Sequence, residues 1–308
     1  MSTSTVPLME ADVAASRELR AQFGRFWATA QGTPREVYDR FIGATPTAPG
    51  VTTREVRDAP LTGWWCEPVE STKLTGATGA RTGRAILFLH GGGYGLGHAG
   101  PYTGFVSQIV ARSGVPAFAL EYPLAPEAQW PTARDLAVSA LAALTERFES
   151  VAVVGDSAGG GLSFATVLEA RRRGLPVAAI ATFSPWTDLS LSGESARDPA
   201  VVDPLLAVDY LRASAAAYLG ATPADDPRAS PLFETDLRLP PTLIQVGSDE
   251  VLRDDSIRMA RAAEAAGTDV ELQVWQGMHH VFQLNTQELA SARLALDRTA
   301  EFLVRHLR

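Results

Sequence analysis

Cysteine and lysine are almost absent from this sequence of 308 residues. Cys66 is the only cysteine, which excludes an intrachain disulfide, a Cys-cluster zinc site and a CxxC redox pair. Lys73 is the only lysine, and it stands in a Thr- and Gly-rich stretch at residues 71–83. Schiff-base chemistry, a Ser-Lys dyad and a Walker loop would all depend on that one side chain, so these classes are nearly excluded.

Long apolar runs and an excess of positive charge are missing as well. The chain has 27 basic and 35 acidic side chains and no basic stripe, so a nucleic-acid partner is not expected. No apolar run approaches the ~18 residues that a membrane span needs. Residues 1–16 lack the cationic start and apolar block of a secretory signal. With the single cysteine, these absences predict a cytoplasmic protein that has no membrane span.

From residue 85 onward, short apolar runs alternate with helical patterns. Strands are predicted over residues 85–89, 115–120, 151–154, 177–183, 241–246 and 270–275, and helices over residues 104–113, 132–148, 158–173, 253–266 and 287–307. This alternation predicts an α/β fold with a mostly parallel central sheet and helices on both faces. A hairpin predicted over residues 51–57 and 61–67 would give the sheet an antiparallel edge.

Two segments fall outside this alternation. Residues 1–48 are predicted to be helical, and residues 184–239 carry several prolines around one helical piece at residues 205–218. We expect both segments to form a helical cap over the sheet. The remaining residues from 49 to 308, with the insertion at 184–239, would then form the main domain.

The sequence Gly155-Asp156-Ser157-Ala158-Gly159 carries the strongest chemical signal. It follows a predicted strand directly and begins a predicted helix, which is the context that a G-x-S-x-G nucleophile elbow requires. Such a turn exposes the serine oxygen at the carboxyl end of the sheet, where open α/β folds bind ligands. Ser157 is therefore a candidate nucleophile, and it needs a general base and an acid that orients the base.

The general base and the acid should lie at the same edge of the sheet as Ser157. His279 and His280 follow the predicted strand at 270–275, and since adjacent side chains point in different directions, only one of them should reach Ser157. Asp249 follows the preceding strand at 241–246, so the chain order is serine, acid, histidine, as in α/β-hydrolases. The competing acids are Asp188, Glu250, Asp254 and Asp255. The adjacent histidines lack the spacing and the third ligand of a zinc motif, so no metal is expected.

A glycine-rich loop supplies candidate donors for an oxyanion. His90-Gly91-Gly92-Gly93 follows the predicted strand at 85–89, and loops of this type contribute to the oxyanion hole of lipases and esterases together with the residue after the nucleophile. The backbone N–H groups of Gly92, Gly93 and Ala158 are the candidates.

Five motifs together resemble one known family. They are His90-Gly91-Gly92-Gly93-Tyr94, Tyr122-Pro123-Leu124-Ala125-Pro126-Glu127, Gly155-Asp156-Ser157-Ala158-Gly159-Gly160, Asp249-Glu250-Val251-Leu252-Arg253-Asp254 and Gly277-Met278-His279-His280-Val281-Phe282. In this order, and over nearly the whole chain, they resemble the bacterial hormone-sensitive-lipase-like (family IV) esterases, in the subgroup with the GDSAG motif.

The resemblance implies an α/β-hydrolase fold with a helical cap and a serine carboxylesterase that hydrolyses short- to medium-chain esters through an acyl-enzyme. It selects His280 over His279 as the base and gives supporting roles to His90, Glu127 and Asp156. No cofactor is implied, the partner is a small-molecule ester, and a homodimer is compatible with the family. The cap residues expected to line the substrate pocket are Phe23, Trp27, Trp186, Leu206 and Tyr210.

Three alternatives compete with this hypothesis. Residues 95–100 match the dinucleotide fingerprint G-x-G-x-x-G and Glu121 follows at a suitable distance, but the match does not begin at the end of a strand. A non-catalytic small-molecule receptor on the same fold would leave Asp249 and His280 without a role. A deacetylase or lactonase acting on a specialised acylated metabolite uses the same chemistry, and the sequence leaves it open.

Overall fold

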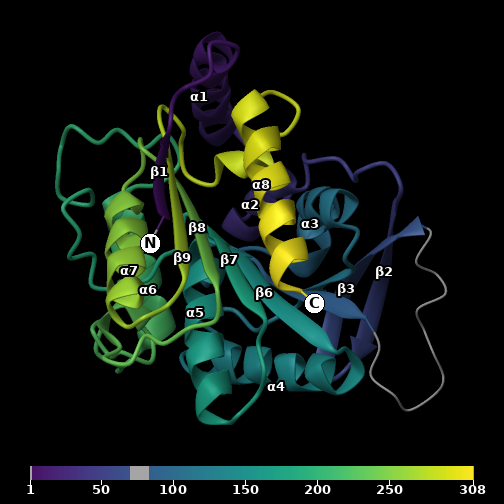
Figure 1. Ribbon diagram of the computed structural model, residues 1–308. Coiled ribbons are helices and arrows are strands. Elements are labelled where there is room, and N and C mark those ends of the chain that lie inside the picture. The colour runs from purple at the N-terminus through teal and green to yellow at the C-terminus, as the bar shows by residue number, and fades with distance from the viewer. Residues whose placement is uncertain (1, 70–82, 308) are drawn as a thin grey trace.

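The computed structural model describes residues 2–69 and 83–307. Lys73 and nearly all of the Thr- and Gly-rich stretch lie outside these residues. Within them, nine strands form one sheet in the order β1-β9-β8-β7-β6-β4-β5-β3-β2 (Figure 1). The strands are β1 (Ser2–Val6), β2 (Val51–Asp58), β3 (Leu61–Pro68), β4 (Arg84–Leu89), β5 (Ala117–Leu120), β6 (Ser150–Asp156), β7 (Ala179–Phe183), β8 (Thr242–Gly247) and β9 (Val270–Trp275).

The sheet is parallel except at one edge. There β2 pairs antiparallel with β3 and β3 antiparallel with β5, as the predicted hairpin requires. The helices are α1 (Asp12–Thr29), α2 (Pro34–Ile42), α3 (Ala99–Ser113), α4 (Thr132–Arg147), α5 (Ser157–Arg172), α6 (Val208–Leu219), α7 (Arg253–Ala265) and α8 (Ala290–His306). The predicted α/β class, with a mostly parallel sheet and helices on both faces, is confirmed.

Successive residues of the central strands pack on opposite faces of the sheet, because side chains alternate along a strand. Ile86 and Phe88 of β4 belong to the core beneath α3 and α8, whereas Leu87 and Leu89 belong to the core beneath α4, α5 and α7. Both faces of β4 and β6 are therefore apolar, which explains why their sequences are continuous apolar runs. The buried sheet holds the ends of its strands rigidly.

The N-terminal segment is not helical from its start, contrary to the prediction for residues 1–48. Ser2–Val6 forms β1, which pairs in parallel with β9 from Ser2 opposite Glu271 to Val6 opposite Trp275. The Ser/Thr/Val composition of this stretch suits a strand better than a helix. Helices α1 and α2 follow, and α2 begins with a capping box in which Thr33 and Glu36 satisfy each other's backbone N–H groups.

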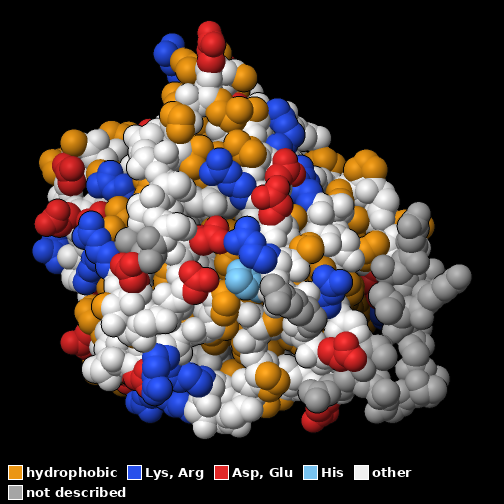
Figure 2. Space-filling model, viewed as in Figure 1, with side chains coloured by type: hydrophobic (Ala, Val, Ile, Leu, Met, Phe, Trp, Pro, Cys, Tyr) orange, Lys and Arg blue, Asp and Glu red, His pale blue; other side chains and the backbone are white. Residues whose placement is uncertain are grey.

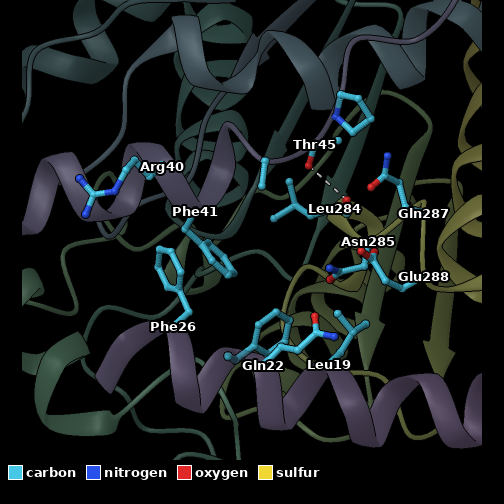
Figure 3. A pocket seen from close by; sticks show the side chains of 13 residues that line it. Leu19, Gln22, Phe26, Arg40, Phe41, Thr45, Leu284, Asn285, Gln287 and Glu288 are labelled. Atoms are coloured by element: carbon cyan, nitrogen blue, oxygen red, sulfur yellow. Dashed lines mark hydrogen bonds between the residues drawn. The ribbon is translucent and has the colours of Figure 1, made fainter. Parts of the chain in front are cut away.

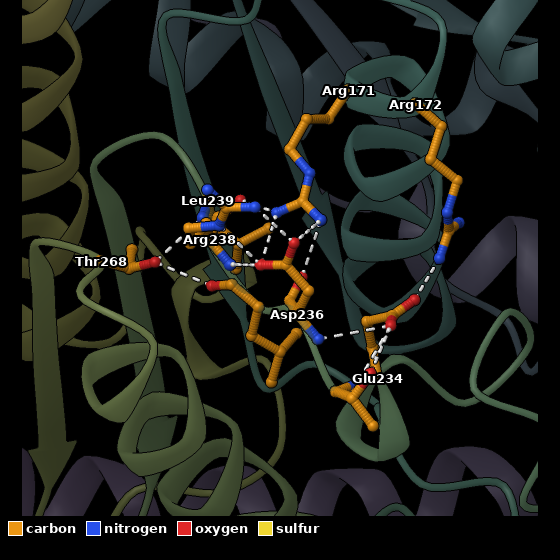
Figure 4. Close-up of polar contacts among 9 residues, drawn as sticks. Arg171, Arg172, Glu234, Asp236, Arg238, Leu239 and Thr268 are labelled. Carbon is orange, nitrogen blue, oxygen red and sulfur yellow. Dashed lines mark hydrogen bonds and ion pairs between the residues drawn. The ribbon is translucent and has the colours of Figure 1, made fainter.

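The segment predicted as an insertion, residues 184–239, contains α6 and is fixed to α5 by a cluster of ion pairs (Figure 4). Asp236 accepts hydrogen bonds from Arg171 at the end of α5 and from Arg238, and Glu234 pairs with Arg172. The hydroxyl of Thr268 accepts a hydrogen bond from the backbone N–H of Leu239 at 2.9 Å. The end of the insertion is thus held against the last turn of α5 and the loop before β9.

Candidate active site

Ser157 lies at the sharp turn where β6 ends and α5 begins. Its φ of +52° is in the left-handed region, which a serine adopts only where the surrounding structure imposes it. The neighbouring glycines are sterically required: a Cβ on Gly159 would lie 2.0 Å from the carbonyl oxygen of Leu89, and one on Gly155 would lie 2.4 Å from that of Gly159. The turn has the geometry of a nucleophile elbow.

Ser157, His280 and Glu250 form a continuous line of hydrogen bonds. The Ser157 hydroxyl lies 2.9 Å from Nε2 of His280, and Nδ1–H of His280 donates to Oε2 of Glu250 at 2.7 Å. The other Glu250 oxygen accepts from the Ser184 hydroxyl at 2.8 Å and from the Gly247 N–H at 2.7 Å. The carboxylate is fully buried and its orientation is fixed by these donors. With the proton on Nδ1, Nε2 is free to accept the serine proton.

Asp249, the acid that the sequence predicts, does not contact His280, so that placement is wrong. Its side chain is 41% exposed, and its Oδ2 accepts a hydrogen bond from Arg20 of α1 at 2.8 Å. Asp249 and Glu250 are consecutive in a turn, so their carboxylates leave the backbone in different directions and only Glu250 faces inward. The sequence offered Glu250 as a competing acid, but no spacing rule ranked it above its neighbour.

Three carboxylates act on the pKa of His280. Burial lowers this pKa, but the charge and hydrogen bond of Glu250, followed by the charges of Asp203 and Asp156, raise it by more, so the net shift is upward. Asp203 comes from the segment between β7 and β8, is partly buried, and accepts hydrogen bonds from the backbone of Leu205, Leu206 and Val251. Nothing in the sequence pointed to Asp203, because its position depends on how the insertion folds.

His279 lies behind the site. Its Nε2–H donates to the side-chain oxygen of Asn285 at 3.0 Å, and its ring packs edge-on against Phe23 with centroids 5.0 Å apart. Burial lowers the pKa of His279 to about 4, so it is neutral at physiological pH. Only His280 of the pair reaches Ser157, as expected from their adjacency.

The glycine-rich loop lies beside Ser157. Gly92 and Gly93 border the same pocket as Ser157 and have φ values of +112° and +61°. Within residues 2–69 and 83–307, no protein group accepts a hydrogen bond from either of their N–H groups. A Cβ on Gly92 would lie 2.2 Å from the carbonyl oxygen of Leu96. Ala158, the third candidate donor, is the first residue after Ser157 in α5.

Asp156 connects the elbow to the glycine-rich loop. Its Oδ1 accepts the Gly91 N–H at 2.9 Å and its Oδ2 accepts the Tyr102 hydroxyl at 3.0 Å, which in turn lies 2.8 Å from the hydroxyl of Tyr38 in α2. Burial raises the pKa of Asp156 to about 7. This chain of contacts positions the loop relative to Ser157, and the two tyrosines had not been predicted from the sequence.

His90 and Glu127, the other predicted supporting residues, lie further from Ser157. Nδ1–H of His90 donates to the carbonyl of Gly91, its ring stacks on Tyr122 at 4.2 Å, and burial lowers its pKa to about 4. Glu127 is exposed and pairs with Arg35 of α2. Arg35 also donates to the carbonyl of Gly95 at 2.9 Å, so the ion pair with Arg35 connects Glu127 to the loop.

The pocket above Ser157 has a volume of about 440 Å³ and a largely apolar lining. Trp27, Leu206 and Tyr210 line it, as predicted. Phe23 and Trp186 do not. Trp186 is fully buried, and its indole N–H donates to the carbonyl of Asp188 at 3.0 Å, because the chain turns inward directly after β7.

Phe23 borders a second pocket instead, of about 240 Å³, between α1, the end of α2 and the loop after His280 (Figure 3). Leu19, Phe26 and Glu288 also line it. Phe41 and Leu284 border both pockets and separate them. The aromatic side chains of α1 and α2 thus line two cavities.

Among the residues that the structure describes, no group of three or more His, Cys, Asp or Glu side chains is placed to hold a metal ion. No helix in the same part of the chain is long and apolar enough to cross a membrane. Figure 2 shows acidic and basic side chains interspersed over one face of the molecule.

Comparison with known proteins gives a consistent result. A family model described as alpha/beta hydrolase fold matches residues 86–284. An acetyl-hydrolase of Streptomyces hygroscopicus is 38% identical over 225 residues, which cover 72% of this chain and 75% of that protein. An esterase of Acinetobacter venetianus is 33% identical over 273 residues, which cover 87% of each chain.

Solved structures agree over nearly the full length. The crystal structure of an esterase from the bacterial hormone-sensitive lipase family has a TM-score of 0.87 and 32% identity, covering 96% of this chain and 99% of that one. At this identity the likeness extends to sequence as well as to fold.

Proposed function

The chain belongs to the α/β-hydrolase family, within its bacterial hormone-sensitive-lipase-like esterases, and is a carboxylic ester hydrolase; we propose that it acts through a serine acyl-enzyme on short- to medium-chain esters. The single observation that carries this proposal is the buried line from Ser157 through His280 to Glu250. It supplies a nucleophile, a base and an orienting acid in hydrogen-bond reach of one another.

In the proposed reaction, Nε2 of His280 takes the Ser157 proton as the serine oxygen attacks the ester carbonyl carbon. The N–H groups of Gly92, Gly93 and Ala158 would stabilise the oxyanion, and Glu250 the imidazolium. The C–O bond to the alcohol then breaks and His280 returns the proton to the leaving alkoxide. A water molecule activated by the same histidine hydrolyses the acyl-enzyme, so the residues need no cofactor.

The pocket supports the proposed substrate range. Its volume of about 440 Å³ lies at the lower end of the range typical of small-molecule sites, and Phe41 and Leu284 limit its length on one side. The similarity to an acetyl-hydrolase favours one alternative, the removal of acetyl groups from a specialised metabolite, which would use the same residues.

Two further expectations belong to this proposal. Helices α1 and α2 and the insertion at residues 184–239 act as one cap over the main domain, since α1, α2 and α6 all contribute to the pocket, whereas β1 belongs to the sheet through its pairing with β9. The buried Cys66 is compatible with action in the cytoplasm. The protein would act there either as a monomer or as a homodimer.

The test is hydrolysis of p-nitrophenyl acetate, butyrate, octanoate and palmitate by the wild type and by Ser157→Ala, with folding of both checked by circular dichroism. We expect activity on the shorter esters, falling toward palmitate, and its loss by about a million-fold in kcat in Ser157→Ala. Equal activity in the two proteins would refute the serine mechanism. Selective turnover of an acetylated compound, with little activity on butyrate, would favour the deacetylase.

A further inference from the structure

One side chain of the N-terminal helix α1 contacts three separate loops around the site. Arg20 donates to Oδ2 of Asp249 at 2.8 Å, to the carbonyl of Gly277 at 3.4 Å and to the carbonyl of Val202 at 3.5 Å. These three residues belong to the loop of the acid, the loop of the histidine and the insertion. Arg20 is separated from Asp249 by 229 positions in the sequence.

The acid and histidine loops are also bonded directly to each other. The Ser248 N–H donates to the carbonyl of Trp275 at 2.9 Å, and the Asp249 N–H donates to that of Met278 at 3.1 Å. The Ser248 hydroxyl accepts the Gly277 N–H at 2.8 Å and donates to Oδ1 of Asp249 at 2.6 Å. The Asp249 carboxylate is therefore fixed by Ser248 through one oxygen and by Arg20 through the other.

This network lies immediately outside the reacting groups. Glu250 follows Asp249 directly, and His280 comes three residues after Gly277, so the 2.7 Å contact between Glu250 and His280 depends on how the two loops sit against each other. A displacement of about 1 Å in a catalytic constellation can cost about 100-fold in rate. An ordinary exposed ion pair, by contrast, contributes little to stability.

We propose that Arg20 and Asp249 are a positioning pair that holds the acid loop against the histidine loop and so keeps Glu250 in contact with His280. The proposal rests on the proposed serine mechanism. Asp249 is not the orienting acid, since His280 bonds to Glu250, but the proposal gives it a positioning role and makes α1 part of the structure that aligns the site.

Arg20→Ala, Arg20→Lys and Asp249→Asn test the pair, with Arg25→Ala as the matched control. Arg25 lies on the same helix and also forms one ion pair, but its partner is the exposed Glu18. Measurements are kcat and KM for p-nitrophenyl butyrate, the thermal midpoint, and the pH dependence of kcat/KM.

We expect Arg20→Ala to lower kcat about 10- to 100-fold with KM nearly unchanged, because the groups that bind the ester are not displaced. Arg20→Lys should recover part of the loss, and Arg25→Ala should match the wild type. The double variant Arg20→Ala/Asp249→Asn should be no slower than the slower of its two single variants, as expected for residues that act as a unit.

The pKa of His280 separates positioning from a simple loss of charge. Glu250, Asp203 and Asp156 are the carboxylates that raise this pKa. Removing a nearby cation alone would raise it further, whereas loosening the contact with Glu250 lowers it. We therefore expect the acid limb of the Arg20→Ala profile to move to lower pH.

An Arg20→Ala protein with the kcat of Arg25→Ala and an unmoved or raised acid limb would overturn the proposal. If the wild type hydrolyses no ester, the proposed function fails but the pair is still tested, since an NMR titration of the His280 imidazole reports its pKa without substrate. A lower pKa in folded Arg20→Ala than in the wild type would support the proposal, and an equal or higher value would refute it.

Discussion

The site is built from two regions that differ in burial and in the kind of residue they contribute. The sheet-borne region supplies Ser157, Glu250 and His280 from the ends of β6, β8 and β9, and these side chains are buried. The N-terminal region supplies Arg20 and Arg35, which are partly exposed and bind loops rather than reacting groups. The difference indicates that strand ends carry the chemistry, whereas the N-terminal helices set the alignment of the loops and the shape of the pocket.

The largest contrast should appear between the two adjacent acids of one loop. Glu250→Gln removes the charge that stabilises the imidazolium, so we expect kcat to fall about 10,000-fold, as in other triads that lose their acid charge. Asp249→Asn should cost no more than Arg20→Ala. Steady-state kinetics on p-nitrophenyl butyrate measure both. If Asp249→Asn proved slower than Glu250→Gln, the assignment of Glu250 as the orienting acid would be wrong.

The glycine-rich loop offers a second contrast within four residues. A Cβ at Gly92 would collide with the carbonyl of Leu96 at 2.2 Å, whereas one at Gly95 meets nothing closer than 3.5 Å. Gly92→Ala should therefore displace an oxyanion donor and lower kcat about 100-fold or more. Gly95→Ala should stay close to the wild type. Equal rates for the two variants would remove this loop from the mechanism.

The pH profiles of the wild type and of Glu250→Gln test the contact between His280 and Glu250. His280 must be neutral to accept the Ser157 proton, and its pKa is raised above the ordinary value of 6.5 by Glu250. kcat/KM should thus fall as the pH decreases through this raised pKa, with an acid limb above pH 6.5. Glu250→Gln should move the limb to lower pH. A wild-type limb below pH 6.5 would contradict the upward shift.

The smallest effect should come from the wall between the two pockets, at Phe41 of α2, and it should alter selectivity more than rate. Phe41→Ala removes part of the wall between the two pockets, so longer acyl chains gain buried surface. At about 0.8 kcal/mol for each buried methylene, kcat/KM should rise about fourfold for each additional methylene accommodated. The ratio of octanoate to acetate turnover measures this gain.

Filling the second pocket supplies the control for that experiment. Gln22 lines the second pocket but not the pocket above Ser157, so Gln22→Trp should abolish the gain of Phe41→Ala while leaving acetate turnover unchanged. A ratio that stays constant in Phe41→Ala would show that the wall does not limit chain length.

The sheet and the elbow could be predicted because local patterns determine them. Apolar runs, helical periodicity and the glycines around Ser157 each act within a few residues, and the matching strands and helices lie close to their predicted ranges. His279 and His280 were placed at the right edge for the same reason.

The errors share one cause, which is that long-range packing decides the direction of a side chain. Which of Asp249 and Glu250 faces inward depends on Ser184 and Arg20, far away in the sequence. Phe23 and Trp186 are aromatic and belong to the predicted cap segments, but the packing of α1 against His279 and the inward turn after β7 keep both away from the Ser157 pocket. β1 was missed because five residues form a strand only when β9 is beside them.

The pairing of β1 with β9 has a practical consequence for how the protein is handled. β9 leads directly to the loop that carries His280, and β1 covers its outer backbone groups. A variant that lacks residues 2–6 would expose β9 as an open sheet edge, which can pair with another chain and promote aggregation. A tag or fusion partner is therefore better attached after the C-terminal helix than in place of the first strand.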